Sequence, residues 1–256
     1  MSRVLFIGNS QLACVKVALD GQPHLLGERQ VAYMAFSQLW AGGLEVVDGI
    51  VRGPKQIRSD VILNEARLDD YDCVVIVGMG VSTMRAAAIY LTHRLLPHHK
   101  QGMHLLSEGA FEAAMTEAVL RSGAGQILAK LRPATEMPIL LVPEPLVNAA
   151  IRKDDVWSGV WTGEFVPFLV AQYFECVRRY LGSQADLLMQ PPETIADEVF
   201  TRSSYGDGAL MNAVRTRKNG LQFRYSEEDR DYKHMNEQYG ELVCRGIGGW
   251  LAGRGL

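Results

Sequence analysis

The 256-residue sequence has only four cysteines, little net charge and no long uninterrupted apolar run. The cysteines lie far apart, so no CxxC metal or redox motif is present, and we expect reduced core thiols in an intracellular protein. They are Cys14, Cys73, Cys176 and Cys244. With 26 basic and 29 acidic residues, the formal charge is only −3. This balance argues against a protein dominated by binding to a nucleic-acid backbone.

A membrane span and a targeting segment are also missing from the pattern. The most apolar longer stretch, 165–181, is interrupted by Gln172, Glu175, Arg178 and Arg179, which is typical of a helix in a water-soluble protein. The apolar run at 4–7 is too short for a signal peptide. We therefore expect a cytoplasmic protein without membrane or nucleic-acid partners.

Short apolar runs alternate with segments of helical periodicity. Apolar runs predict strands at 30–36 and 185–189, and strands buried on both faces at 4–7, 72–77 and 138–143. Helices are predicted at 12–19, 82–95, 108–131 with a break at 123–125, 164–181, and from Tyr239 to Leu251. A hairpin is expected around Asp48-Gly49. The alternation predicts an α/β protein, a three-layer α/β/α sandwich with a mainly parallel, flavodoxin-like sheet.

Ligands of such sheets bind beyond the carboxyl ends of the strands, so the segments that follow the strands are the ones to inspect. Gly8-Asn9-Ser10 follows the first strand. The next helix begins there, and its N-terminal N–H groups and positive dipole end suit a developing oxyanion. Ser10 is therefore a candidate nucleophile. The simpler alternative is that Ser10 only caps the helix.

A second candidate segment, Asp231-Tyr232-Lys233-His234, lies near the C-terminus. A D-x-x-H spacing lets one short loop present a carboxylate and an imidazole together. The carboxylate can hold one ring nitrogen as donor, which leaves the other nitrogen free to act as a base. The alternative is a charged surface, because residues 227–230 are all charged.

Taken together, the two segments resemble the SGNH, or GDSL-type, hydrolase family. That family has its nucleophile in a Gly-Asp-Ser block after the first strand and its Asp and His in a final D-x-x-H block. Here Asn9 replaces the Asp of the first block, and residues 235–240 resemble the family's continuation into the last helix. The resemblance implies Ser10 as nucleophile, His234 as base and Asp231 as the group that orients His234. It implies no metal or cofactor.

The resemblance also implies an oxyanion hole formed by N–H groups of Ser10, Ser37 and Gly80. Ser37 ends the second predicted strand, and the glycines at 42, 43 and 53 are the other candidates there. Gly80 falls where the family has Asn, so one side-chain donor is missing, which typically costs about 10²–10³ in rate. Asn64 and Ser82 are candidates to replace it.

The sequence thus predicts a serine-dependent ester hydrolase, an esterase or deacylase, that acts on a small or carbohydrate-linked acyl ester. The departures at Asn9 and Gly80 keep two alternatives open: a non-catalytic binding module and a glycan O-acyltransferase on the same fold. Because the candidate residues come from both ends of the chain, we expect one domain over residues 1–256.

Other motifs are weaker. Gly78-x-Gly80-x-x-Thr83 lacks the third glycine of a dinucleotide-binding loop. A histidine cluster without acidic or cysteine ligands fits a solvated basic turn better than a zinc site; it comprises His93, His98, His99 and His104. The basic and aromatic segment 215–225 fits a solvated surface better than a single-stranded nucleic-acid site. The tryptophans, including Trp157 and Trp161, are expected in the core or at its rim, with sugar stacking as the alternative.

Overall fold

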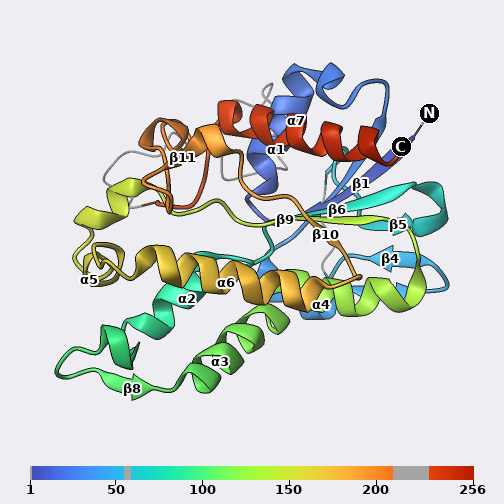
Figure 1. Ribbon diagram of the computed structural model, residues 1–256. Helices are drawn as coiled ribbons and strands as arrows, with labels where there is room; N and C mark the ends of the chain where they lie inside the picture. Colours follow the sequence, from blue (N-terminus) through green and yellow to red (C-terminus); the bar gives the residue numbers. More distant parts are fainter. Residues whose placement is uncertain (1, 55–58, 210–230) are drawn as a thin grey trace.

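A computed structural model describes residues 2–54, 59–209 and 231–256, and its centre is a five-stranded sheet (Figure 1). The strand order is β10-β9-β6-β1-β2, and every neighbouring pair is parallel. The strands are β1 (Arg3–Gly8), β2 (Gln30–Ala35), β6 (Cys73–Val77), β9 (Ile139–Val142) and β10 (Asp186–Leu187). The predicted α/β class with a parallel sheet is confirmed.

Helices cover both faces of this sheet, which explains why its central strands are continuous apolar runs. On one face lie α1 (Leu12–Gly21) and α7 (Glu237–Gly253); on the other lie α2 (Thr83–Tyr90), α3 (Glu108–Leu120), α4 (Gly123–Leu131) and α6 (Val166–Leu181) (Figure 1). The residues of β1 alternate between the two cores: Val4 and Phe6 pack toward α1 and α7, whereas Leu5 and Ile7 pack toward the other layer.

Smaller elements surround the sandwich. Three antiparallel strands, β3 (Glu45–Val47), β4 (Ile50–Arg52) and β5 (Glu65–Arg67), include the predicted hairpin. The remaining strands are β7 (His93–Leu95), β8 (His104–Leu106), β11 (Ile195–Ala196) and β12 (Phe200–Thr201), and α5 is Ser158–Trp161. Short 3₁₀ helices are η1 (Pro23–Leu26), η2 (Gln38–Gly43), η3 (Leu68–Asp70), η4 (Leu96–His98), η5 (Arg132–Ala134), η6 (Ala149–Lys153), η7 (Pro192–Thr194) and η8 (Ser203–Tyr205).

Two predicted helices differ from the structure. The helix predicted over 82–95 ends at Tyr90, because the chain leaves it to pair β7 with β8, and His104 N donates to the Thr92 carbonyl. The histidine segment is therefore a strand pair joined through η4 rather than a simple turn. The helix predicted over 108–131 is two helices. Ser122 caps the second one by accepting a bond from Gly125 N at 3.0 Å.

The apolar and aromatic residues behave as core. All four cysteines are buried and unpaired. Trp161 is 1% exposed and packs edge-on against Phe200, so it is a core residue and not a stacking surface. Among the described residues, no helix is long and apolar enough to cross a bilayer. The segment 215–225 lies outside the described residues.

The strand order creates a switch point between β1 and β6. The chain passes from β1 to β2 on one side and later enters β6 on the other, so the loops that follow β1 and β6 diverge. A crevice at the carboxyl ends of such strands is where open α/β sheets bind ligands. Ser10 follows β1, and Gly80 follows β6, at this position.

Candidate active site

Ser10 does not cap the helix that follows it. The N-cap residue of α1 is Gln11, and its side chain makes no capping bond. The turn is held by Asn9, whose Oδ1 accepts a bond from Gln11 N at 3.0 Å, and by the Ser10 carbonyl, which accepts from Ala13 N. The Ser10 hydroxyl, on a partly exposed residue, is left for another partner. Its Oγ lies 2.7 Å from His234 Nε2.

Asp231 and His234 form a compact turn before α7. Oδ1 of Asp231 accepts bonds from the backbone N–H groups of Lys233 and His234, and Oδ2 lies 2.5 Å from His234 Nδ1. The side chains of Asp231 and His234 are only 7% and 13% exposed. An ionised carboxylate can only accept, so Nδ1 is the donor, and Nε2 of a neutral ring accepts the Ser10 proton. The three side chains form one continuous hydrogen-bonded chain.

Asp231 is held in its ionised form. Burial raises the pKa of this carboxyl group. The hydrogen bond and charge of His234, with the backbone bonds from Lys233 and His234, together outweigh burial and bring the pKa below its ordinary value. The charged carboxylate therefore keeps the imidazole in one tautomer and one orientation.

Contacts on both sides fix the loop that carries His234. Asn148, after β9, donates its N–H to the Tyr232 carbonyl at 2.8 Å. The Tyr232 hydroxyl donates to Asp154 Oδ2 at 3.2 Å. On the helix side, Asn236 caps α7, because its Oδ1 accepts from Tyr239 N at 3.1 Å. The loop is therefore anchored to the segment after β9 and to α7.

A glycine lets α7 approach α1 closely. A Cβ on Gly240 would lie 2.1 Å from the carbonyl oxygen of Cys14, a backbone atom of α1. Only glycine permits this distance without a shift of one helix. Because α1 begins just after Ser10 and α7 begins just after His234, this contact sets how closely the two side chains approach.

The turn after β6 has an unusual backbone. Gly78, Met79 and Gly80 have successive φ values of 72°, 51° and 79°. A left-handed conformation is uncommon for a residue with a side chain and is concentrated at functional sites. A Cβ on Gly78 would also lie 2.7 Å from Asn9 Oδ1. The turn therefore brings the backbone after β6 directly against the loop that carries Ser10.

Glu144 is a site residue that the sequence reasoning did not single out. It follows β9 and is 7% exposed. Its Oε1 accepts bonds from Gly80 N at 3.1 Å and from Asn9 Nδ2 at 3.3 Å. One buried carboxylate thus joins the loops after β1, β6 and β9. Its position directly after a buried strand was a usable signal, but partners 64 and 135 residues away are not visible in the sequence.

The predicted oxyanion donors lie at the same sheet edge. Phe36 N donates to the Gly8 carbonyl at 3.0 Å, which holds Ser37 beside the Ser10 loop. Gly80 is also at this edge, but its N–H already donates to Glu144. The backbone of each proposed substitute is bonded elsewhere: Ser82 N donates to the Tyr173 hydroxyl at 2.9 Å, and the Asn64 carbonyl accepts from Gly53 N. These bonds do not test their side chains as donors. The oxyanion roles stay predictions.

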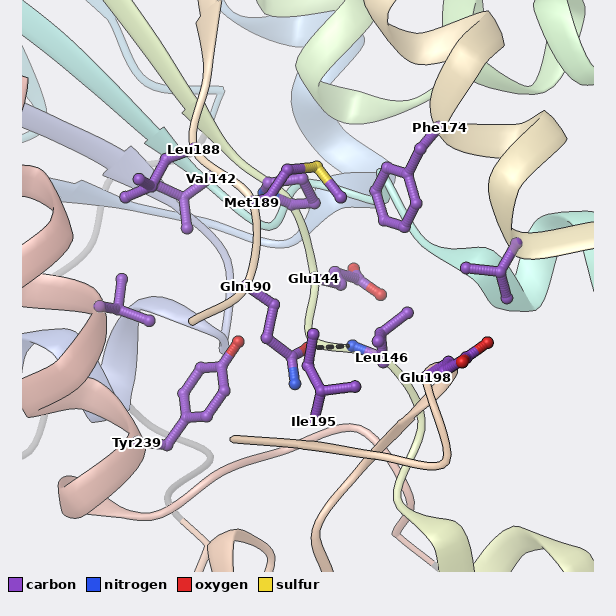
Figure 2. A pocket seen from close by; sticks show the side chains of 13 residues that line it. Val142, Glu144, Leu146, Phe174, Leu188, Met189, Gln190, Ile195, Glu198 and Tyr239 are labelled. Atoms are coloured by element: carbon purple, nitrogen blue, oxygen red, sulfur yellow. Dashed lines mark hydrogen bonds between the residues drawn. The ribbon is translucent and has the colours of Figure 1, made fainter. Parts of the chain in front are cut away.

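A cavity of about 110 Å³ lies beside Glu144 (Figure 2). Figure 2 shows Phe174 of α6 and Tyr239 of α7 on opposite sides, with Glu144 between them. Gln190 lines it too and accepts a bond from Leu146 N at 2.7 Å. Burial raises the pKa of the Tyr239 hydroxyl well above its ordinary value. Apart from Glu144, Gln190, Glu198 and the Tyr239 hydroxyl, the lining side chains are apolar.

No protein-family model matches the chain, and no curated protein sequence matches it. Solved structures with a similar chain path include a GDSL-like lipase from Bacteroides thetaiotaomicron, 11% identical with a TM-score of 0.42, where the match covers 99% of this chain and 89% of that one. An extracellular lipase from Streptomyces rimosus is 11% identical with a TM-score of 0.44, covering 97% and 100%. A protein from Lactobacillus plantarum is 13% identical with a TM-score of 0.42, covering 100% and 98%.

Proposed function

We propose that the protein is a serine-dependent hydrolase of carboxylic esters that works through an acyl-enzyme. The observation that carries the proposal is the chain of contacts from Asp231 Oδ2 to His234 Nδ1 and from His234 Nε2 to Ser10 Oγ, at 2.5 and 2.7 Å. A hydroxyl becomes a useful nucleophile only when a positioned base takes its proton. Here the base is in reach, and a carboxylate orients it.

Ser10 Oγ attacks the ester carbonyl carbon while His234 Nε2 takes the hydroxyl proton. The tetrahedral intermediate collapses when the carbon–oxygen bond to the alcohol breaks and the imidazolium returns that proton to the leaving oxygen. Water then attacks the acyl-enzyme with His234 again as base, which releases the acid and restores Ser10. Asp231 stabilises the imidazolium in both halves without accepting a proton itself.

In this proposal the oxyanion receives hydrogen bonds from the backbone N–H groups of Ser10 and Ser37, with Gly80 as the third donor. The N–H of Gly80 contributes only after it exchanges its bond with Glu144 for one with the substrate. A site with fewer preset donors is expected to be slow, because each such donor contributes about 10²–10³ in rate.

We propose that the cavity beside Glu144 takes the acyl group. None of Ser10, Asp231 and His234 lines it. Its link to the site is Glu144, which bonds to Asn9, the residue before Ser10. The cavity volume of about 110 Å³ is smaller than the apolar cavity of about 150 Å³ that accommodates benzene in another protein. We therefore propose acetyl to butyryl esters of small alcohols or of carbohydrates as the substrates to try first. A carbohydrate hydroxyl in place of water would turn the same acyl-enzyme chemistry into O-acyl transfer.

The test uses a fluorophosphonate probe and p-nitrophenyl acetate. The wild-type protein is expected to react with the probe and to hydrolyse the ester, because the probe reports a serine activated by a base. Ser10→Ala is expected to abolish both activities while its urea unfolding curve stays close to that of the wild type. Ser183→Ala, at an exposed serine after α6, is the matched control and is expected to keep both.

Two outcomes would contradict the proposal. Labelling and hydrolysis that persist in Ser10→Ala would show that Ser10 is not the nucleophile. A wild-type protein that is folded but neither labels nor hydrolyses would favour the non-catalytic binding module.

A further inference from the structure

Arg85 occupies the space that a side chain at position 80 would use. Its Nε donates to the Gly80 carbonyl at 2.6 Å. A Cβ built on Gly80 would lie 2.9 Å from Arg85 Nη2 and 2.7 Å from Gln38 Oε1. The absence of a side chain at Gly80 therefore leaves room for two polar side chains from other elements. Sequence reasoning selected neither of them.

A short series of contacts connects Arg85 to Ser10. Arg85 bonds to Gly80, the Gly80 N–H bonds to Glu144, and Glu144 bonds to Asn9, the residue before Ser10. Arg85 and Glu144 contact opposite ends of the Gly80 residue, its carbonyl and its N–H. The guanidinium is thus part of the strand-end surface that holds the candidate nucleophile.

Within residues 2–54, 59–209 and 231–256, the positive charge of Arg85 has no carboxylate partner. Gly80 O is the partner that the structure gives it. Several other arginines do pair with carboxylates: Arg52, Arg67, Arg121, Arg152, Arg178, Arg179 and Arg254. Arg85 belongs to the other half of the described arginines, those without an ion pair, and among the contacts described above it is the one that bonds to the turn after β6.

The local helix adds to this positive region. Arg85 lies in the first turn of α2, which contains no acidic residue and has no side-chain cap from Ser82. The N-terminal end of a helix carries partial positive charge, so a cation there is unfavourable unless an anion compensates it. Thr83, the first residue of α2, is 2% exposed, and its Oγ1 has no hydrogen-bond partner among the described residues. The uncompensated cation at the start of α2 is the feature that an anion would satisfy, whereas the Thr83 hydroxyl is too deeply buried to take part.

We propose that Arg85 binds a carboxylate on the substrate, so that the ester hydrolysed at Ser10 is a negatively charged one. This inference rests on the proposed function. Because Nε is committed to Gly80, the two Nη groups remain, and their fork matches the two oxygens of a carboxylate. The oxyanion of the intermediate is a single oxygen and fits this fork less well.

The test compares esters that differ only in charge. On the acyl side, p-nitrophenyl butyrate is paired with the p-nitrophenyl monoester of succinate; on the alcohol side, O-acetylated glucose is paired with O-acetylated glucuronic acid. We expect the wild type to prefer the charged member of at least one pair. Arg85→Gln should lower kcat/KM for that charged ester by about 10- to 100-fold, mainly through KM, because a charge-assisted bond is lost. The neutral ester should lose clearly less than the charged one, since it loses only the support that Arg85 gives the Gly80 carbonyl and no bond of its own to the guanidinium.

Controls separate a structural effect from recognition. Arg85→Lys keeps the charge but not the fork and is expected to retain part of the preference. Arg178→Gln, at a partly exposed arginine paired with Glu175 on α6, is expected to retain all of it. An equal loss on charged and neutral esters in Arg85→Gln would overturn the proposal, because it would indicate an effect on the oxyanion or on folding. An unchanged preference would overturn it too.

A binding measurement distinguishes failure of this proposal from failure of the proposed function. Calorimetric titration of Ser10→Ala with the succinate monoester measures affinity without turnover, and Ser10→Ala combined with Arg85→Gln is the comparison. Loss of binding only in the double variant supports the carboxylate site even if no ester is hydrolysed. Equal binding by both variants rejects the site even if Ser10 proves to be the nucleophile.

Discussion

Gly240→Ala is expected to separate Ser10 from His234 without altering either residue. The new Cβ would lie 2.1 Å from the Cys14 carbonyl oxygen, 2.5 Å from its carbon and 3.1 Å from Val15 N. All three are backbone atoms, so no side chain can rotate away, and α7 must move from α1 by about 1 Å to restore ordinary contact distances. Such overpacking typically costs about 1–3 kcal/mol, partly offset by the better helix propensity of alanine, about 1 kcal/mol.

The same shift should reduce catalysis. The Ser10 Oγ to His234 Nε2 distance is 2.7 Å, and a further 1 Å breaks this hydrogen bond. A misplacement of about 1 Å can cost about 10²-fold in rate. We therefore expect kcat/KM for p-nitrophenyl acetate and the rate of fluorophosphonate labelling to fall by about 100-fold at temperatures where the variant is still folded.

Gly249→Ala is the matched control in the same helix. A Cβ there has nothing within 4 Å, so alanine is expected to stabilise the protein by up to about 1 kcal/mol and to leave activity unchanged. Urea unfolding midpoints and labelling rates of the two variants are compared side by side. If Gly240→Ala matches Gly249→Ala in both measurements, the close contact between α1 and α7 does not control the distance between the candidate nucleophile and its base.

Asp231→Asn should change the dependence of stability on pH. The pKa of Asp231 is lower in the folded protein than in the unfolded chain, so its contribution is present above the unfolded value, about 3.9, and is lost as the pH falls through the folded value. Urea midpoints from pH 7 to pH 3 should show the wild type converging on Asp231→Asn at the acid end; parallel curves would contradict this. Glu144→Ala should lower the free energy of unfolding by about 1–3 kcal/mol, because it leaves the buried N–H groups of Gly80 and Asn9 without an acceptor. Glu144→Gln keeps an acceptor oxygen and should lose less, and equal losses would refute the assigned contacts.

The buried centre of the fold could be predicted from the sequence because its signal is local. The runs at 72–77 and 138–143 predict β6 and β9 almost residue by residue, since strands covered on both faces must be apolar throughout. The last strand is less clear: of the segment 185–189, only Asp186 and Leu187 belong to β10, and Leu188 N adds one more bond to the Leu141 carbonyl of β9. The sequence prediction also placed the end of α2 too late, at residue 95 instead of Tyr90. Residues 93–95 form a strand only because they pair with a segment eleven residues later, and a local periodicity cannot show such a partner.

The residues of the candidate site likewise fall into those that a local motif predicts and those that only the contacts in the structure reveal. Ser10, Asp231 and His234 were selected because each stands in a short motif with its own chemistry, and the structure brings all three together. Glu144 and Arg85 have no motif. They matter because of contacts to Gly80, and a glycine gives no hint of which side chains will fill the space it leaves. Sequence reasoning recognised that position 80 lacks a side chain but could not see what stands there instead.

The separation of 224 residues between the hydroxyl of Ser10 and the ring of His234 has a consequence during synthesis. All five strands of the central sheet precede residue 231, so they leave the ribosome before the imidazole does. Domains begin to fold as their segments emerge, and the sheet can therefore assemble while the hydroxyl still has no base. A nascent chain halted before residue 231 carries Ser10, the candidate nucleophile, without Asp231 and His234. If the proposed function holds, ester hydrolysis appears only when α7 docks on α1, and it reports completion of the chain rather than formation of the sheet.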